Sequence, residues 1–332
     1  MRVTQSDIAE ETGFSVSTVS RALRGIGNIN KSDERLILET AKRLNYPLQQ
    51  SAGSRLKKQN NFIALVTGFH TGEFYSSFFN GFVEAAEAKE QYVSLFSISA
   101  DVDKVCSLLD DLREAGYSSA VLFVPGLHSD DYEKILEYVP DYFPLISCTN
   151  IDHPVMDTVT FDAYRGASLV AKHFIDRGYK SVGFIEGPVD KPEARFRKSG
   201  FIDVITHTEG TDFIWSYPGD YSLESGIRAF EQFKKLKKKP RAVFAANDAT
   251  ALGFMESARA EGYHFPNDIA LAGYDNLPMC KYHFPNITSV NTNFTKLAKI
   301  TLDTLTERQY NSIDHQGLVS LVPVDLKIRQ SS

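Results

Sequence analysis

The sequence predicts a small all-α head followed by an α/β core of two doubly wound parallel-sheet subdomains. Two observations favour this organisation. Short amphipathic helical segments occupy residues 4–46, whereas buried strand-like runs alternate with helix-length amphipathic segments from Asn61 onward. The chain has 332 residues, of which 42% are hydrophobic. This length and composition are sufficient for two or three folding units with large apolar cores.

The first two helices are expected between residues 4 and 24. Thr4 followed three residues later by Asp7 is a capping pair that begins the first helix. Gly13 stands where the chain must turn with positive φ, a conformation that glycine adopts at little cost. Ser15 is placed to cap the second helix. The segment therefore predicts two short helices joined by a tight turn.

The residue spacing across this turn is typical of a helix-turn-helix. Ala9 permits a close helix crossing, Gly13 makes the turn, and Val19 fills the gap between the helices. The second helix keeps a polar side that can reach base edges and phosphates in a major groove, formed by Ser17, Thr18, Ser20 and Arg21. An ordinary surface helical hairpin with hydroxyl-rich caps is the alternative interpretation of this local pattern.

A third helix is expected after Asn30, which with Asp33 caps its first turn. It ends near Tyr46, and its predicted buried stripe consists of Leu36, Ile37, Ala41 and Leu44. Residues 47–60 are polar and small, so they are predicted to form a linker that becomes helical only when DNA or a partner stabilises it.

Charge is unevenly distributed along the chain. Residues 1–58 carry ten Lys and Arg against six Asp and Glu, whereas the whole chain has a formal charge of −6. A basic head on an acidic body fits a DNA-reading module attached to a part with a different task. The acidic total argues against a protein that coats nucleic acid without selectivity.

The core alternates strands and helices, which indicates open parallel sheets with ligands at the carboxyl ends of their strands. The segment 150–158 divides these units into two subdomains. After Pro285, a strand, a helix and a final strand are expected to cross back and complete the first sheet. The predicted strands are Phe62–Gly68, Tyr92–Ile98, Ala120–Gly126, Pro144–Ile151, Thr158–Asp162, Ser181–Gly187, Phe213–Tyr217, Ala242–Asn247, Ile269–Asp275, Ser289–Asn293 and Val319–Ile328.

Several classes of protein are disfavoured by what the sequence lacks. Cys106, Cys148 and Cys280 match neither a metal-ligand spacing nor a disulfide framework, so reduced buried thiols in a cytoplasmic protein are expected. No apolar run approaches 18 residues, and the N-terminus is polar, which argues against membrane spanning and secretion. No nucleophile elbow, phosphate loop or dinucleotide fingerprint follows a strand, so we expect no enzyme activity, cofactor or metal ion.

The order of head, linker and two α/β subdomains resembles the lactose-repressor (LacI/GalR) family of bacterial transcription regulators over nearly the whole chain. The strongest match is Val16-Ser-Thr-Val-Ser-Arg-Ala-Leu, which is similar to the recognition helix of that family. Further matches are Asn247-Asp-x-x-Ala-Leu-Gly253, Pro266-x-Asp-Ile-Ala-x-x-Gly-Tyr-Asp275, His173-x-x-x-x-Gly178 and Arg197-x-x-Gly-Phe201. Together these motifs favour DNA binding over the helical-hairpin alternative.

The resemblance implies a helix-turn-helix head in residues 1–46, a hinge in 47–60 and a periplasmic-binding-protein-like core in 61–332. The core would divide into an N-subdomain (about 61–160 and 291–321) and a C-subdomain (about 161–290 and 322–332). Base reading is implied for Val16, Ser17 and Arg21, because arginine can donate two hydrogen bonds to guanine. Phosphate contacts, which fix the register of the protein on DNA, are implied for Ser6, Ser15, Thr18, Ser20 and Asn28.

The hinge departs from the family pattern. The segment Tyr46-Pro-Leu-Gln-Gln-Ser-Ala-Gly-Ser-Arg-Leu56 has Gly53 where the family has arginine, and it places Leu56 one residue late. Glycine should weaken a hinge helix by about 1 kcal/mol relative to alanine. Either Leu56 intercalates into the minor groove after a register shift, which we favour, or Arg55 enters the groove instead.

In the core, the resemblance implies an effector between the two subdomains. The residues that match the family's ligand-lining positions are Phe74, Tyr75, Asp162, Arg197, Tyr221, Asn247 and Asp275, with Ser76 beside them. Planar guanidinium and carboxylate groups suit sugar hydroxyls, and aromatic rings cover apolar sugar faces. The alternatives are that the aspartates cap helices, Arg197 forms a surface ion pair and Phe74 belongs to the core. His173 is interpreted as structural.

The leading functional hypothesis is a repressor controlled by a small effector, with a sugar or sugar phosphate favoured over a purine or nucleoside. A homodimer would place two heads on a near-palindromic operator. The sequence leaves open whether the effector releases DNA or promotes binding. A dimer is expected rather than a tetramer, because no leucine heptads follow the last core strand. A solute-binding protein for transport is disfavoured, because the helix-turn-helix occupies the place of an export signal.

Overall fold

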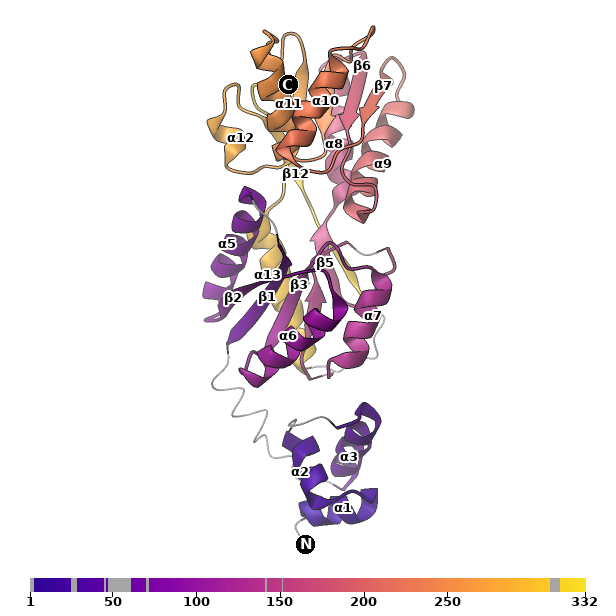
Figure 1. Cartoon of the computed structure of the whole chain (residues 1–332), viewed down its shortest axis with the longest axis vertical. Coiled ribbons are helices and arrows are strands. Elements are labelled where there is room, and N and C mark those ends of the chain that lie inside the picture. Colours follow the sequence, from indigo (N-terminus) through magenta and orange to yellow (C-terminus); the bar gives the residue numbers. More distant parts are fainter. Residues whose placement is uncertain are drawn as a thin grey trace.

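The computed structural model describes residues 3–24, 29–44, 46, 61–69, 72–140, 142–150, 152–310 and 317–332. Figure 1 shows a helical head and two α/β subdomains that follow one another along the long axis of the chain. Asn28, Arg55 and Leu56, and with them the hinge predictions, lie outside the described residues. None of the helices in the described ranges combines the length and apolar character needed to cross a membrane.

The head contains helices α1 (Gln5–Thr12), α2 (Val16–Arg24) and α3 (Lys31–Arg43). The predicted cap of α1 is present, because the backbone N–H of Thr4 donates to Asp7 Oδ2 at 2.7 Å. Gly13 ends this helix in the left-handed conformation, with φ 75°. The predicted helix–turn–helix path is therefore the observed one.

The small core of the head includes Val19 and Ile37, both fully buried. One part of the predicted stripe of α3 is wrong, because Leu36 is 47% exposed. Successive residues of a helix differ by about 100° around its axis, so the face that carries Ile37 and Ala41 toward α1 and α2 turns Leu36 outward.

The first subdomain is an all-parallel sheet with the strand order β11-β5-β4-β3-β1-β2. Helices α5 and α13 cover one face of this sheet, and helices α6 and α7 cover the other. The elements are β1 (Phe62–Gly68), α5 (Glu73–Glu87), β2 (Tyr92–Ile98), α6 (Val102–Glu114), β3 (Ser119–Phe123), α7 (Ser129–Tyr138), β4 (Leu145–Ser147), β5 (Thr158–Phe161), α13 (Phe294–Tyr310) and β11 (Val319–Val322).

The second subdomain repeats this plan with the strand order β12-β10-β9-β8-β6-β7, in which only β12 is antiparallel. Helices α10 and α11 cover one face, and α8 and α9 cover the other. The elements are α8 (Ala163–Asp176), β6 (Ser181–Ile185), α9 (Pro192–Thr206), β7 (Asp212–Tyr217), α10 (Leu223–Phe233), β8 (Ala242–Ala245), α11 (Asp248–Ala260), β9 (Ala270–Asp275), α12 (Met279–Tyr282), β10 (Thr288–Asn291) and β12 (Asp325–Lys327).

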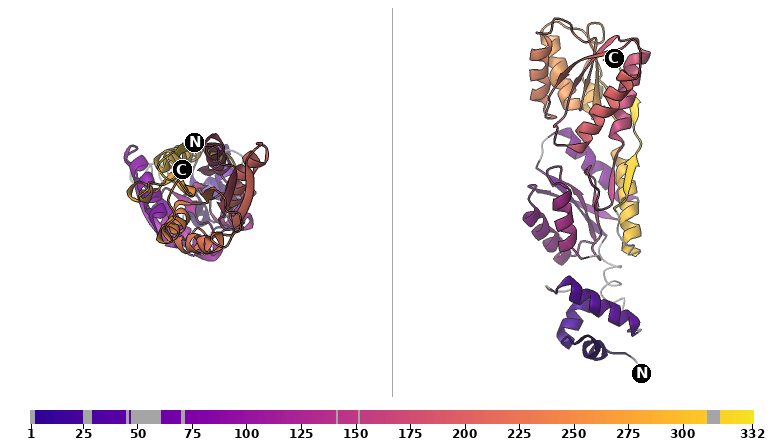
Figure 2. Two further views of the ribbon diagram at one scale, coloured as in Figure 1. Left: turned by 90° about the horizontal axis from the view of Figure 1, so that it is seen from above. Right: turned by 90° about the vertical axis from the view of Figure 1, so that its right-hand side faces the viewer.

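The chain passes between the two sheets after β5, after β10 and after β11. The expectation that every segment after Pro285 completes the first sheet is therefore wrong. Strand β10 pairs with β9 of the second sheet, and the predicted final strand divides into β11 and β12, which belong to different sheets. Pro323 lies at this division, where a residue without a backbone N–H interrupts strand pairing. Figure 2 shows α13 beside the lower subdomain and the chain rising from it into the upper one.

Candidate functional site

Polar and aromatic side chains gather where the first subdomain meets the carboxyl ends of the strands of the second. The subdomains are joined here by the ion pair of Arg195 with Asp152 and by hydrogen bonds that include the following two. The backbone N–H of Met279 donates to Glu73 Oε2 at 3.0 Å, and Lys191 Nζ donates to the carbonyl oxygen of Pro125 at 2.7 Å. The N-terminus of α5 therefore lies against this edge of the second sheet. We call Tyr75, Glu193, Arg197, Tyr221, Tyr274 and Asp275 the interdomain cluster.

Arg197 is the centre of this cluster. It lies on α9 and is buried, with its Nη2 atom 3.6 Å from Asp275 Oδ1. Its Nη1 atom donates to the carbonyl oxygen of Ala246. The guanidinium carbon lies 3.7 Å from the ring centroid of Tyr274 and 5.5 Å from that of Tyr221. The surface ion-pair alternative for Arg197 is wrong, because both partners of its ion pair are buried.

Burial dominates the electrostatics of the cluster. It raises the pKa of Asp275 well above the usual range, against the opposing effect of the Arg197 charge. Burial likewise raises the pKa of Glu193. The hydroxyl of Tyr75, which comes from the first subdomain, also has a raised pKa, through burial and the nearby charges of Glu193 and Asp275. Side chains of both subdomains thus share one electrostatic environment.

Unsatisfied polar atoms are concentrated in the cluster. Folded proteins pair most of their buried polar atoms, so such a concentration marks a surface that can accept a polar partner. Among the described residues, the buried side-chain atoms without a hydrogen bond include Glu193 Oε2, Arg197 Nε, Tyr221 OH, Tyr274 OH and Asp275 Oδ1.

The backbone is strained at the same place. Tyr221, Asp275 and Asn276 have φ values of 67°, 107° and 56°, in a region that residues with a Cβ atom seldom adopt. Such strain persists only where the surrounding structure imposes it, and it clusters at functional sites. Gly187 allows the close approach of Tyr221, because a Cβ atom on that glycine would lie 2.5 Å from the tyrosine ring.

Asn247 and Asp162, two of the predicted ligand-lining residues, have structural partners. Asn247 caps α11 by accepting a hydrogen bond from the backbone N–H of Thr250 at 3.0 Å, and its Nδ2 atom donates to the carbonyl oxygen of Tyr221 at 2.9 Å. Asp162 caps α8 by accepting from the backbone N–H of Arg165 at 2.9 Å. The helix-capping alternative therefore holds for Asp162, and any contact of either residue with a ligand stays a prediction.

The predicted aromatic residues of α5 differ in their surroundings. Phe74 packs into the core of the first subdomain, with its ring centroid 5.3 Å from that of Phe294 and 5.7 Å from that of Phe123. Tyr75 lies beside it, 5.3 Å away between ring centroids. Ser76 is exposed and donates to the carbonyl oxygen of Glu73. Of these residues, Tyr75 is the one whose pKa is raised by charges of the second subdomain.

Two members of the cluster, Glu193 and Tyr274, were not among the sequence predictions. Glu193 precedes Arg197 by four residues, a spacing that places both on one face of α9. That spacing was the signal available for Glu193. Tyr274 lies directly before Asp275 in strand β9 and is fully buried.

The surroundings of His173 and of the three cysteines fit a structural role. His173 Nε2 lies 2.9 Å from the hydroxyl of Ser332, and burial lowers the pKa of the imidazole. All three cysteine thiols are free and buried, and burial raises the pKa of Cys148 to about 12. Within the described ranges, no group of three or more His, Cys, Asp or Glu side chains is placed to hold a metal ion.

In the head, the described candidate DNA contacts lie on α1, on α2 and at the turn between them. Ser15 Oγ accepts from the backbone N–H of Thr18 at 3.1 Å, so Ser15 caps α2 as expected. Val16 is 46% exposed, and Ser17, Arg21 and Ser6 are also exposed. Thr18 and Ser20 are half-buried. Helix α2 thus presents Val16, Ser17 and Arg21 outward while Val19 packs into the core.

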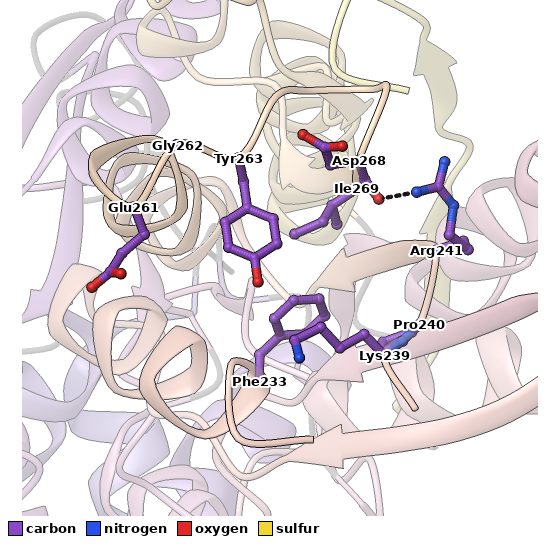
Figure 3. A pocket seen from close by; sticks show the side chains of 9 residues that line it. All are labelled: Phe233, Lys239, Pro240, Arg241, Glu261, Gly262, Tyr263, Asp268 and Ile269. Atoms are coloured by element: carbon purple, nitrogen blue, oxygen red, sulfur yellow. Dashed lines mark hydrogen bonds between the residues drawn. The ribbon is translucent and has the colours of Figure 1, made fainter. Parts of the chain in front are cut away.

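A surface pocket of about 520 Å³ lies elsewhere in the second subdomain, at the amino ends of the strands of its sheet (Figure 3). It is formed by the end of α10, the start of β8 and the residues that follow α11. Arg241 at its rim donates to the carbonyl oxygens of Asn267 and Asp268, and Lys239 donates to that of Leu236. These cations join loops of the fold, and the pocket contains none of the predicted site residues.

Comparison with known proteins finds a family model, curated relatives and solved structures that are similar to the chain. A family model described as a periplasmic binding protein-like domain matches residues 171–332. Catabolite control protein A of Priestia megaterium is 27% identical over 336 residues, covering 100% of both chains. The ribose operon repressor of Escherichia coli is 24% identical, covering 97% of both chains. A solved lac repressor dimer bound to operator and the anti-inducer ONPF superposes with a TM-score of 0.73 at 23% identity, covering 100% of this chain and 99% of that one.

Proposed function

Because this chain belongs to the lactose-repressor (LacI/GalR) family of DNA-binding transcriptional regulators, we propose that it is a repressor whose operator affinity is set by a sugar bound between the subdomains. The observation that carries the proposal is the interdomain cluster, where a buried Arg197–Asp275 pair adjoins unsatisfied polar atoms and aromatic rings. Sugar hydroxyls both donate and accept hydrogen bonds, so a sugar matches guanidinium, carboxylate and phenol groups together.

The proposed mechanism couples this site to the head through the relative position of the subdomains. A ligand that contacts Tyr75 from one subdomain and Arg197 from the other favours the closed arrangement, because only that arrangement makes both contacts. Closure moves the first subdomain, to which the hinge and head are attached, and so changes the spacing between the two heads of a dimer. Heads at the wrong spacing cannot occupy both halves of a near-palindromic operator.

The DNA-binding part of the proposal is tested by selection from a random double-stranded DNA library with the full chain. We expect enrichment of a near-palindromic sequence at moderate salt, because two identical heads read two half-sites. The same library with excess effector should yield altered recovery of that sequence. Failure to enrich any sequence over the input would contradict sequence-specific binding.

The effector part is tested by thermal unfolding with sugars, sugar phosphates and purines. A specific ligand at 100-fold excess over Kd should stabilise the protein by about 2.7 kcal/mol. Stabilisation by a purine alone would favour the alternative in which the aromatic rings of the cluster stack on a base. Catalytic turnover of a bound sugar would contradict the proposal that the chain is a regulator.

We also propose that the chain forms a homodimer through its core. Tyr282, the last residue of α12, and Phe284, in the loop that leads to β10, are 83% and 71% exposed. Adjacent large aromatic side chains in water indicate a contact surface. The variant Tyr282→Asp should shift the protein from dimer to monomer in sedimentation, whereas Leu318→Asp, at an apolar residue 66% exposed in the first subdomain, should not. A monomeric wild-type chain or a stable tetramer would contradict this proposal.

A further inference from the structure

Glu193 has one buried carboxyl oxygen without a hydrogen-bond partner. It lies in the first turn of α9, four residues before Arg197. Its Oε2 atom is buried and makes no hydrogen bond, and burial raises the pKa of the carboxyl group. A buried carboxylate oxygen without a donor is costly for the fold, so a donor supplied from outside would be strongly favoured there.

The basic groups around Glu193 have other partners. Arg197 donates to the carbonyl oxygen of Ala246 and pairs with Asp275. Lys191 lies 2.8 Å from Asp190 and donates to the carbonyl oxygen of Pro125. Lys198, one residue beyond Arg197, pairs with Glu186 at 2.9 Å. Glu193 and Asp275 both lie near the Arg197 guanidinium, and Lys191 is a further cation whose charge acts on Glu193.

On the basis of the proposed function, we propose that Glu193 is a specificity-determining residue that accepts hydrogen bonds from an uncharged or aminated sugar and excludes sugar phosphates. A hydroxyl or ammonium group of the ligand would supply the donor that Oε2 lacks. A phosphate at the same place would bring its negative charge beside the two acidic groups Glu193 and Asp275, in surroundings where charges are poorly screened.

The test compares the full-length wild-type chain with Glu193→Gln, which preserves the size of the side chain and removes its charge. Glu231→Gln is the matched control, because Glu231 is an exposed acid on α10 paired with Lys234. Isothermal titration is carried out with ribose, ribose 5-phosphate, glucose, glucosamine, glucose 6-phosphate and cellobiose. The glucose and glucosamine arms distinguish a hydroxyl donor from an ammonium donor.

We expect a neutral or aminated sugar to bind the wild-type chain at least roughly tenfold more tightly than any phosphate in the set. Glu193→Gln should weaken the binding of that sugar by roughly tenfold or more, because a charged acceptor makes the stronger hydrogen bond. It should also raise the melting temperature of the ligand-free protein, since a buried unpaired charge is removed. Glu231→Gln should change neither quantity.

Two results would overturn the inference while leaving the proposed function intact. One is tighter binding of a sugar phosphate than of its neutral parent by the wild-type chain. The other is unchanged affinity of Glu193→Gln for the sugar that binds the wild-type chain. Absence of binding by every sugar would instead overturn the proposed sugar effector, and the inference with it. Operator selection from the DNA library would then report separately on the regulatory function.

Discussion

Replacement of Arg197 by alanine is expected to abolish effector-induced stabilisation and to lower the free energy of unfolding at pH 7 by about 3–5 kcal/mol. The substitution leaves Asp275 buried without its ion-pair partner and removes a cation that lies 3.7 Å from the centroid of the Tyr274 ring. The proposed ligand loses its guanidinium donor at the same time. The measurement is chemical and thermal unfolding, each with and without the sugar that stabilises the wild-type chain.

Two further variants separate ligand binding from folding. Arg197→Lys retains the positive charge but loses the planar guanidinium group. It should therefore preserve most of the stability of the fold and still weaken ligand binding. Arg259→Ala removes an exposed arginine paired with Glu256 on α11, and its effect on either measurement should be small. DNA binding in effector-free buffer should persist in Arg197→Lys. Normal effector-induced stabilisation of Arg197→Ala would exclude Arg197 from the ligand site.

Arg21→Ala should remove most of the preference of the head for its operator over random DNA. Arg21 is exposed on α2, and a bidentate contact of arginine with guanine contributes about 1–3 kcal/mol of discrimination. The expected loss is therefore roughly 5- to 150-fold in the ratio of specific to non-specific affinity. The measurement is competition between the selected operator and random DNA at one fixed salt concentration, because salt alters both affinities.

The control for this variant is Arg35→Ala. Arg35 is an exposed arginine on α3 that pairs with Glu39 at 3.0 Å, so its removal changes the charge of the head equally. We expect Arg35→Ala to leave the ratio of affinities unchanged. If Arg21→Ala kept its preference for the operator, or if both variants lost it equally, Arg21 would not read bases.

Local sequence patterns predicted the head well because its signals act over a few residues. The Thr4–Asp7 cap and the left-handed Gly13 each depend on one turn of chain. Leu36 was predicted to be buried but is exposed, since a stripe of apolar residues locates a helix face only to within about one residue. The DNA contacts themselves stay predictions, because exposure on α2 is compatible with them and does not test them.

The core was harder to predict where partners are distant in the sequence. Strand β10 has the composition of a buried strand, but its pairing with β9 depends on the topology of the whole sheet. Glu193 stands near Asp190, Lys191 and Arg195, so in sequence it resembles one charge of a solvated helix face. In the folded chain its Oε2 atom is buried, Arg197 lies near it, and its charge acts on Tyr75 of the first subdomain.

Because the chain crosses between the two sheets three times, neither sheet is completed early in biosynthesis. Strand β11 closes one sheet at Val319–Val322, and β12 extends the other at Asp325–Lys327. A chain that is still emerging from the ribosome therefore holds two incomplete sheets until almost all of it has been made. The head lies at the start of the chain and includes none of these late strands, whereas the two sheets of the core cannot be finished before translation is nearly over. A premature stop codon anywhere before Val319 would thus damage both subdomains together.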